Sequence, residues 1–299
     1  MQSLATVFRR DLPDIDVQMT PWNESGPSAM EDASVDLALT PASNAYFAYL
    51  DSITRDAPAD GQVRAISALH TTPLLLAVRD SSAVSRVSDL RGHTSARILL
   101  LPPGELSEME VAAVARREKE RRIQRGDRPD TDRLVELVLH AFDVERFPAR
   151  SLQVLPAKEA LDRFSAGSLD AVWGTGYFTG DVIREATSRG ARLVSIEGPA
   201  IDRLREEYPF IRPIVIPANS YPGQAAPVHT IGVDLLLVCR ASLDEQLVHS
   251  LTRHYIAALG ELSTSHPSLG LVDLELAAAG PIPLHDGAAR YYRESELFR

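Results

Sequence analysis

Short apolar runs alternate with segments of helical periodicity along the whole chain. The runs are rich in Val, Leu and Ile and are bounded by Gly, Pro, Asp or Ser, as buried strands are. The segments between them carry apolar residues every three or four positions, which is typical of helices with one buried face. The pattern predicts an α/β fold in which helices cover mostly parallel sheets. Predicted strands lie near residues 36–40, 63–69, 74–78, 97–101, 152–155, 171–173, 192–196, 213–216 and 230–239.

The first twenty residues have an unusual order of elements. Apolar residues repeat at helical spacing from Leu4 to Leu12, and a strand is predicted at 15–19. Because an α/β lobe normally begins with a strand, we expect that the first strand of this lobe is missing. We therefore expect the natural protein to be longer at its amino end, with that strand, its binding loop and an export signal or anchor upstream.

The segment 169–186 predicts a turn that faces a ligand. A buried strand runs into the glycine-rich turn 174–180, which opens directly onto a helix. The first N–H groups of a helix have no partner within it and the helix dipole is positive there, so an anion is stabilised. Thr175 and Tyr177 would add hydroxyl groups. An ordinary strand-to-helix turn is the alternative, and a dinucleotide-binding turn fits less well because Thr179 stands where its third glycine should be.

A second helix start follows the strand predicted at 36–40. Ser43 or Asn44 is expected to cap that helix with its side chain. In open α/β sheets, ligands bind at the carboxyl ends of the strands, so these polar groups are candidates for a binding site. Capping alone is the alternative interpretation.

Length, charge and cysteine use exclude several classes of protein. With 299 residues, the chain is long enough for two lobes with separate cores. A formal net charge of -10 argues against a nucleic-acid backbone or an anionic membrane as the main partner, and the charged stretch 105–133 has acidic and basic residues in equal number. No apolar window is long enough to span a membrane, and the charged first residues do not form a secretory signal. The single cysteine, Cys239, is predicted to be a buried small hydrophobe.

No motif for catalysis or metal binding is found in the sequence. The histidines show no metal-ligand spacing, and neither a GxSxG nucleophile turn nor a GxxxxGK[ST] phosphate loop occurs. Paired carboxylates lie in charged stretches that are typical of a solvated surface. We therefore expect a protein that is not an enzyme and that holds no metal and no cofactor.

Several stretches resemble a known family. Residues 216–224 read IPANSYPGQ and residues 282–294 read IPLHDGAARYYRE, and both resemble the TAXI family, the extracytoplasmic solute-binding subunits of one branch of TRAP transporters. The resemblance runs over most of the chain in the family's order. Further matching stretches are 36–38 with Tyr46, 87–92, 176–179 and 203–210.

The resemblance implies a periplasmic-binding-protein-like fold of type II, in which two α/β lobes joined by two crossover strands close on a small ligand. Residues 1–95 and 226–299 would form lobe one, and residues 96–225 would form lobe two. The implied ligand is an organic anion or an amino acid, and the implied partners are the membrane-embedded TRAP transporter subunits. The resemblance also implies a monomer with a periplasmic or otherwise extracytoplasmic location, either free or membrane-anchored.

The residues expected to bind the ligand lie at strand ends, at helix starts or where the chain returns from lobe two. They are Ser43, Asn44, Thr71, Gly104, Thr175, Gly176, Tyr177 and Tyr221. Two other functions stay open at this point. One is an enzyme or ligand sensor on the same two-lobed fold, resembling the thiamin-pyrimidine synthesis proteins; the other is an interaction protein that has lost its ligand.

Overall fold

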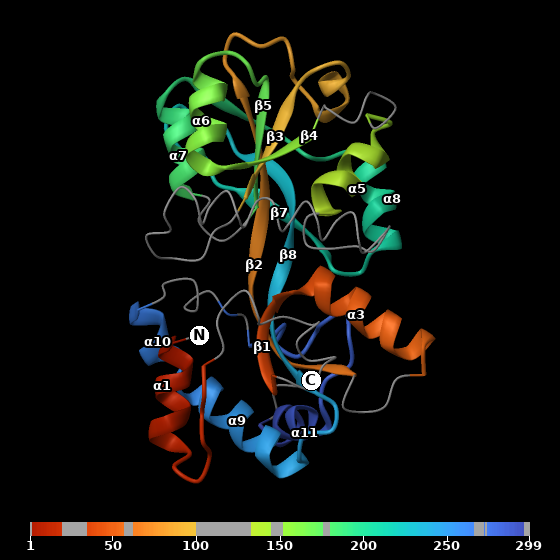
Figure 1. Ribbon diagram of the computed structural model, residues 1–299, viewed down its shortest axis with the longest axis vertical. Coiled ribbons are helices and arrows are strands. Elements are labelled where there is room, and N and C mark those ends of the chain that lie inside the picture. Colours follow the sequence, from red (N-terminus) through yellow and green to blue (C-terminus); the bar gives the residue numbers. More distant parts are fainter. Residues whose placement is uncertain are drawn as a thin grey trace. The chain divides into compact units, whose positions relative to one another are not determined.

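The computed structural model describes residues 2–19, 35–56, 62–99, 133–144, 152–175, 180–265, 272 and 274–295. The chain folds into two compact units. Unit 1 comprises Met1–Thr71 and Val233–Arg299, and unit 2 comprises Thr72–Gly232. Each unit combines strands with covering helices, so the predicted α/β class is confirmed (Figure 1).

Unit 1 is built on strand β1 (Leu37–Pro41) and on parts of two long strands, β2 (Val63–Arg79) and β8 (Val228–Arg240). In the sheet, β8 lies between β1 and β2, and β1 runs antiparallel to β8. Helix α3 (Ala42–Thr54) follows β1 directly. Further helices of unit 1 are α1 (Gln2–Asp11), α9 (Glu245–Ala257), α10 (Leu259–Ser265) and α11 (Asp286–Glu294).

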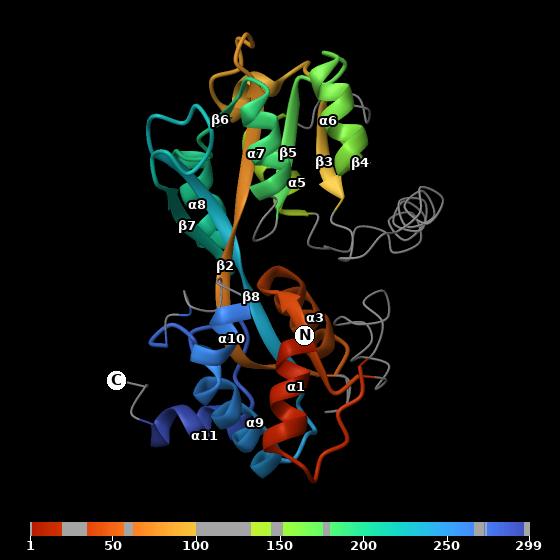
Figure 2. The same cartoon turned by 90° about the vertical axis from the view of Figure 1, so that its left-hand side faces the viewer.

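The core of unit 1 lies between its strands and the helices α1, α9 and α11. Val7 and Phe8 of α1 are buried there, which confirms the helical spacing seen near the amino end. Helices α9 and α11 lie side by side (Figures 1 and 2). They approach so closely at Gly287 that a Cβ atom there would lie 2.2 Å from the carbonyl oxygen of Glu245. Only glycine fits this crossing.

Two local predictions in unit 1 are wrong. Residues 15–19 form no strand; instead, Arg9 of α1 donates from Nε and Nη2 to the carbonyl oxygen of Val17, at 3.0 and 2.6 Å. Helix α3 begins at Ala42 and no side chain caps it, so Ser43 and Asn44 lie inside its first turn instead of capping it. A residue within the first turn points its side chain away from the free N–H groups that a cap would satisfy.

The strands of unit 2 are arranged around β3 (Ser95–Leu99). It pairs in parallel with β4 (Leu152–Pro156) and with β5 (Ala171–Thr175). Strand β2 runs antiparallel to β5 and to β6 (Ala191–Val194), and β7 (Ile211–Ile216) pairs with β8. Strand β3 has two parallel partners, whereas the pairs β1–β8, β2–β5 and β2–β6 are antiparallel, so parallel and antiparallel pairs are mixed, which the sequence pattern did not predict.

Helices cover both faces of the unit 2 sheet. Helices α6 (Ala157–Ser165) and α7 (Gly180–Ser188) lie on one face, and α5 (Arg133–Ala141) and α8 (Pro199–Glu207) lie on the other (Figures 1 and 2). A short 3-10 helix, η3 (Val87–Leu90), precedes β3. The apolar face of α6 and α7 packs on β3 and β5 to form the core of this unit.

The chain passes between the units inside two strands. The units divide at Thr71 on β2 and at Gly232 on β8. Strand β2 is continuous and contains both residues 63–69 and residues 74–78, which were expected to be two strands. The polar and proline-containing stretch 70–73 looks like a break in the sequence but continues the strand. The lobe boundaries expected near residues 95 and 226 stay a prediction.

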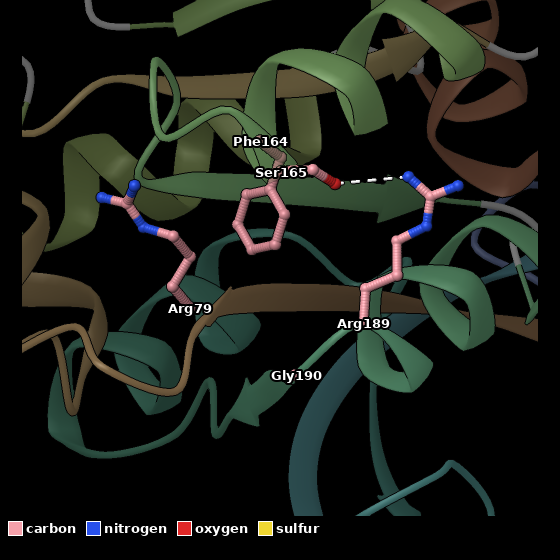
Figure 3. Close-up of a pocket in the computed structure, with 5 residues that line it drawn as sticks. All are labelled: Arg79, Phe164, Ser165, Arg189 and Gly190. Carbon is pink, nitrogen blue, oxygen red and sulfur yellow. Dashed lines mark hydrogen bonds between the residues drawn. The ribbon is translucent and has the colours of Figure 1, made fainter.

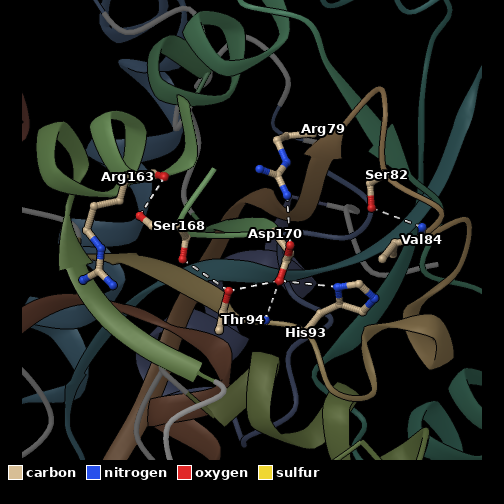
Figure 4. A network of polar contacts seen from close by, with 8 residues as sticks. All are labelled: Arg79, Ser82, Val84, His93, Thr94, Arg163, Ser168 and Asp170. Atoms are coloured by element: carbon tan, nitrogen blue, oxygen red, sulfur yellow. Dashed lines mark hydrogen bonds and ion pairs between the residues drawn. The ribbon is translucent and has the colours of Figure 1, made fainter. Parts of the chain in front are cut away.

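Asp170 connects three segments of unit 2 (Figure 4). Its Oδ1 accepts from Arg79 Nη2 at 3.0 Å, and its Oδ2 accepts from the N–H and Oγ1 of Thr94 at 2.8 and 3.0 Å. His93 Nδ1 lies 3.4 Å from the same Oδ2. Burial acts to raise the pKa of Asp170, but the Thr94 hydrogen bonds and the His93 charge outweigh it and hold that pKa below its ordinary range. The carboxylate therefore stabilises the folded unit in its charged form.

Asp170→Asn is expected to lower the free energy of unfolding of unit 2 by about 2 kcal/mol. The reason is that Arg79 and Thr94 would lose their charged hydrogen-bond acceptor. Because the folded pKa is depressed, this contribution is present at neutral pH and disappears as pH falls through the acid range. Urea unfolding at pH 7 and pH 3 measures both effects. Asp202→Asn, at an exposed carboxylate of α8 that lies 3.6 Å from Arg205, is the control and should change stability little. Equal losses in both variants would contradict the role of Asp170.

Gly287→Ala is expected to lower the stability of unit 1 by about 2 kcal/mol, because its methyl group would overlap backbone atoms of α9. The matched control is Gly260→Ala inside α10, where a Cβ atom meets nothing within 4 Å. That change should raise stability by about 0.5–1 kcal/mol through helix propensity. Thermal unfolding measures both, and a neutral Gly287→Ala would contradict the close crossing of α9 and α11.

Candidate functional site

Polar residues of β2 and β8 meet at one place in unit 1. Thr71 Oγ1 donates a hydrogen bond of 2.7 Å to Asp234 Oδ1. Asp234 is the one acidic residue of β8, stands between apolar neighbours and is only 7% exposed. His70 precedes Thr71 and feels the charge of Asp234. We call His70, Thr71 and Asp234 the Asp234 cluster.

His70 is uncharged at neutral pH. Burial lowers the pKa of His70 to about 4, although the negative charge of Asp234 acts to raise it. A neutral imidazole can donate one hydrogen bond and accept another. Thr71 and Asp234 therefore bring a hydroxyl and a carboxylate together in unit 1, and His70 adds a neutral ring next to Thr71 in the chain.

The first turn of α3 lies next to this cluster. In the β1–β8 pairing, Pro41 is opposite Leu235, the neighbour of Asp234, and α3 begins immediately after Pro41. No side chain caps the first turn, and the N-terminus of a helix attracts acceptors and negative charge. Within the described part of the chain, the hydroxyl of Ser43 is buried and has no hydrogen-bond partner. This end of unit 1 thus offers backbone donors beside a carboxylate.

The loop that holds Tyr221 is tied together from within. Gln224 accepts from the N–H of Tyr221 at 3.2 Å and donates from Nε2 to the carbonyl oxygens of Pro217 and Ala226, both at 2.9 Å. The guanidinium of Arg184, on α7, lies 5.5 Å from the centre of the Tyr221 ring. Burial raises the pKa of Tyr221, and the Arg184 charge opposes that rise. The IPANSYPGQ stretch is therefore an internally hydrogen-bonded loop of unit 2 whose tyrosine lies beside an arginine of α7.

The predicted ligand-binding residues fall into three groups. Ser43, Asn44 and Thr71 lie in unit 1, on α3 and β2, around the Asp234 cluster. Tyr221 lies in unit 2, and Thr175 is the last residue of β5. Three residues lie outside the described part of the chain, and their assignment stays a prediction: Gly104, Gly176 and Tyr177.

Sequence reasoning missed Asp234, which is the hydrogen-bond partner of Thr71, the neutral ring of His70, and the arginine beside Tyr221. Asp234 carried a signal, because a single acid inside a long apolar strand needs a buried partner or a ligand. His70 gave a weaker signal, as a histidine within a stretch that otherwise reads as a strand. Arg184 gave none, because its pairing with Tyr221 depends on the path of the loop.

The described residues contain no group of three His, Cys, Asp or Glu side chains arranged to hold a metal ion. None of the described helices has both the length and the apolar character needed to cross a bilayer.

Three of the solved structures that this chain resembles distantly are described as binding proteins for solutes. An ancestral arginine-binding protein bound to arginine is 12% identical, over 91% of this chain and 84% of its own, with a TM-score of 0.40. The alkanesulfonate-binding protein SsuA from Xanthomonas axonopodis pv. citri bound to MOPS is 14% identical, over 98% and 79%, with a TM-score of 0.43. The substrate-binding protein of an amino acid ABC transporter is 10% identical, over 91% and 85%, with a TM-score of 0.41. At these scores the three are distant likenesses and identify no ligand.

The sequence itself identifies the family. The sequence profile of the NMT1-like family matches residues 118–295. This match spans more than half of the 299 residues. The protein therefore belongs to the NMT1-like family.

Proposed function

We propose that this protein binds a small organic molecule as the extracytoplasmic solute-binding subunit of a TRAP-type uptake system and carries out no reaction on it. The observation that carries the proposal is the Asp234 cluster beside the uncapped first turn of α3. The TAXI-like stretches at 216–224 and 282–294 support the choice of transporter. In this proposal the partners are the ligand and the membrane-embedded TRAP subunits.

The chemistry of the cluster favours an amino acid, with an organic anion as second choice. A carboxylate has several lone pairs, so Asp234 can accept from a ligand ammonium group while it accepts from Thr71. The N–H groups that open α3 can donate to a ligand carboxylate. An amino acid carries both groups a few bonds apart. An organic anion would use the α3 donors alone.

The lack of a recognisable catalytic motif in the sequence favours binding over catalysis. A hydroxyl nucleophile is activated by a base that takes its proton as the new bond forms. Here the Thr71 hydroxyl donates to Asp234, and the sequence contains no GxSxG turn or other recognisable nucleophile motif. An enzyme on the same fold would require turnover of the bound molecule, which the binding experiment below also detects.

Thr71→Val is expected to weaken binding of the preferred ligand at least about tenfold, because it removes the hydrogen bond that orients Asp234. Calorimetric titration with L-glutamate, L-arginine and succinate measures it. The matched control is Thr252→Val in α9, which removes a buried hydroxyl that donates to Val248. Equal affinity in the wild type and Thr71→Val would contradict the proposed site, and release of a chemically altered ligand would contradict the proposed function.

His70 predicts a pH dependence of stability. Its folded pKa of about 4 lies below the ordinary value of about 6.5, so the unfolded chain binds the proton first. The contribution of neutral His70 to the free energy of unfolding should be fully present above about pH 6.5. It should be lost as pH drops from there toward about 4. Urea unfolding of the wild type and His70→Gln over this range isolates the effect, because the variant lacks it. Parallel pH profiles in the two proteins would contradict a buried, neutral His70.

A further inference from the structure

A pocket of about 320 Å³ lies in unit 2 (Figure 3). Its lining residues are Arg79, Phe164, Ser165, Arg189 and Gly190. Arg79 ends β2, and its neighbour Val78 pairs with Ala171 at the start of β5. The pocket is therefore at the amino ends of the parallel strands, whereas the glycine-rich turn follows the opposite end of β5.

Arg79 is held in place but keeps an unused donor. Its Nη2 donates to Asp170 at 3.0 Å. Its Nη1 lies over Gly167, where a Cβ atom would come within 2.6 Å of it, so glycine makes room for the guanidinium. Among the described residues, no acceptor meets the Nε–H of Arg79, although that atom is buried. A buried donor of a charged group is costly to leave without an acceptor.

Arg189 and Ser165 form the other wall of the pocket. Arg189 Nη1 donates to Ser165 Oγ at 3.3 Å, and its Nη2 pairs with Glu185 one turn earlier on α7. Because Ser165 accepts this hydrogen bond, its own hydroxyl proton can be given to a further acceptor. In Figure 3 the Phe164 ring lies between the two arginines. Donors thus border the pocket on two sides of an aromatic ring.

The lining of the pocket carries two positive charges and no acid. The carboxylate of Asp170 accepts from Thr94 as well as from Arg79, so it is satisfied on the far side of Arg79 (Figure 4). Helices α6 and α7 both end beside the pocket, and their carbonyl ends attract guanidinium groups, which accounts for the position of the arginines. This attraction to the helix ends does not supply an acceptor for the Nε–H group of Arg79.

We propose that this pocket binds a small organic oxyanion, a carboxylate, phosphate or sulfonate, between Arg79 and Arg189. The anionic oxygens accept from Arg79 Nε, from Arg189 and from the Ser165 hydroxyl. A volume near the lower end of ligand pockets, about 300–1,000 Å³, leaves room for a few carbon atoms against Phe164. This site is additional to the Asp234 cluster and does not depend on the function proposed for that cluster.

The test follows the arginine Nε–H resonances by NMR at constant ionic strength during titration with sodium phosphate, methanesulfonate, succinate and benzoate, with sodium chloride as reference. Saturable shifts of the Arg79 signal are expected with oxyanions and not with chloride. Arg189→Gln and Ser165→Ala should each weaken this binding about tenfold, equal to about 1.4 kcal/mol. Tighter binding of succinate or benzoate than of phosphate identifies an organic ligand, and the reverse identifies a free inorganic anion.

Arg163→Gln is the matched control, because Arg163 on α6 pairs with Glu159 one turn earlier, as Arg189 pairs with Glu185, but does not line the pocket. It should leave the affinity unchanged. Equal weakening in Arg163→Gln and Arg189→Gln, or a linear shift that never saturates, would overturn the proposal. Solute binding at the Asp234 cluster, measured in the same Arg189→Gln protein, should be unaffected, so failure of either site can be recognised separately.

Discussion

The hydrogen bond between Thr71 and Asp234 joins the two strands that carry the chain from one unit to the other and back. A buried carboxylate is tolerated only with partners, and Thr71 supplies one at the point where unit 1 ends on β2. One residue further into unit 2, Gly232 of β8 lies so close to Thr72 that a Cβ atom would come within 2.4 Å of its carbonyl oxygen. The candidate solute site thus lies close to a point where the backbones of the two long strands approach tightly.

Much of the fold could be predicted because burial leaves a local signature. Runs of apolar residues correctly predicted the strands β3, β5 and β8. The helical spacing of apolar residues correctly predicted that α1 has a buried face. Strand direction left no such trace, since the antiparallel pairing of β2 with β5 depends on contacts between distant segments. Arg9 holds residues 15–19 against α1 through the Val17 carbonyl, so their β-like pattern does not lead to a strand.

The candidate site was predicted less completely than the fold. Thr71 could be predicted as a site residue because it is polar and lies at an apparent strand end. Its role in the site depends on the hydrogen bond to Asp234, which is distant in sequence. Ser43 and Asn44 were expected to cap a helix, and the cap is absent because Pro41 already ends the strand and α3 starts at the next residue. The pocket between Arg79 and Arg189 had no sequence signal at all, since it forms where two helix ends and one strand end meet.

Mass spectrometry of small molecules that stay bound during native purification would show directly whether Asp234 helps to hold a solute. We expect an unmodified organic molecule, of amino acid or organic anion type, to be released from the wild type on denaturation and to be depleted in Asp234→Asn. Thr252→Val, which alters a buried hydroxyl away from the cluster, should retain it. The same molecule in equal amount in wild type and Asp234→Asn would contradict a solute site at Asp234.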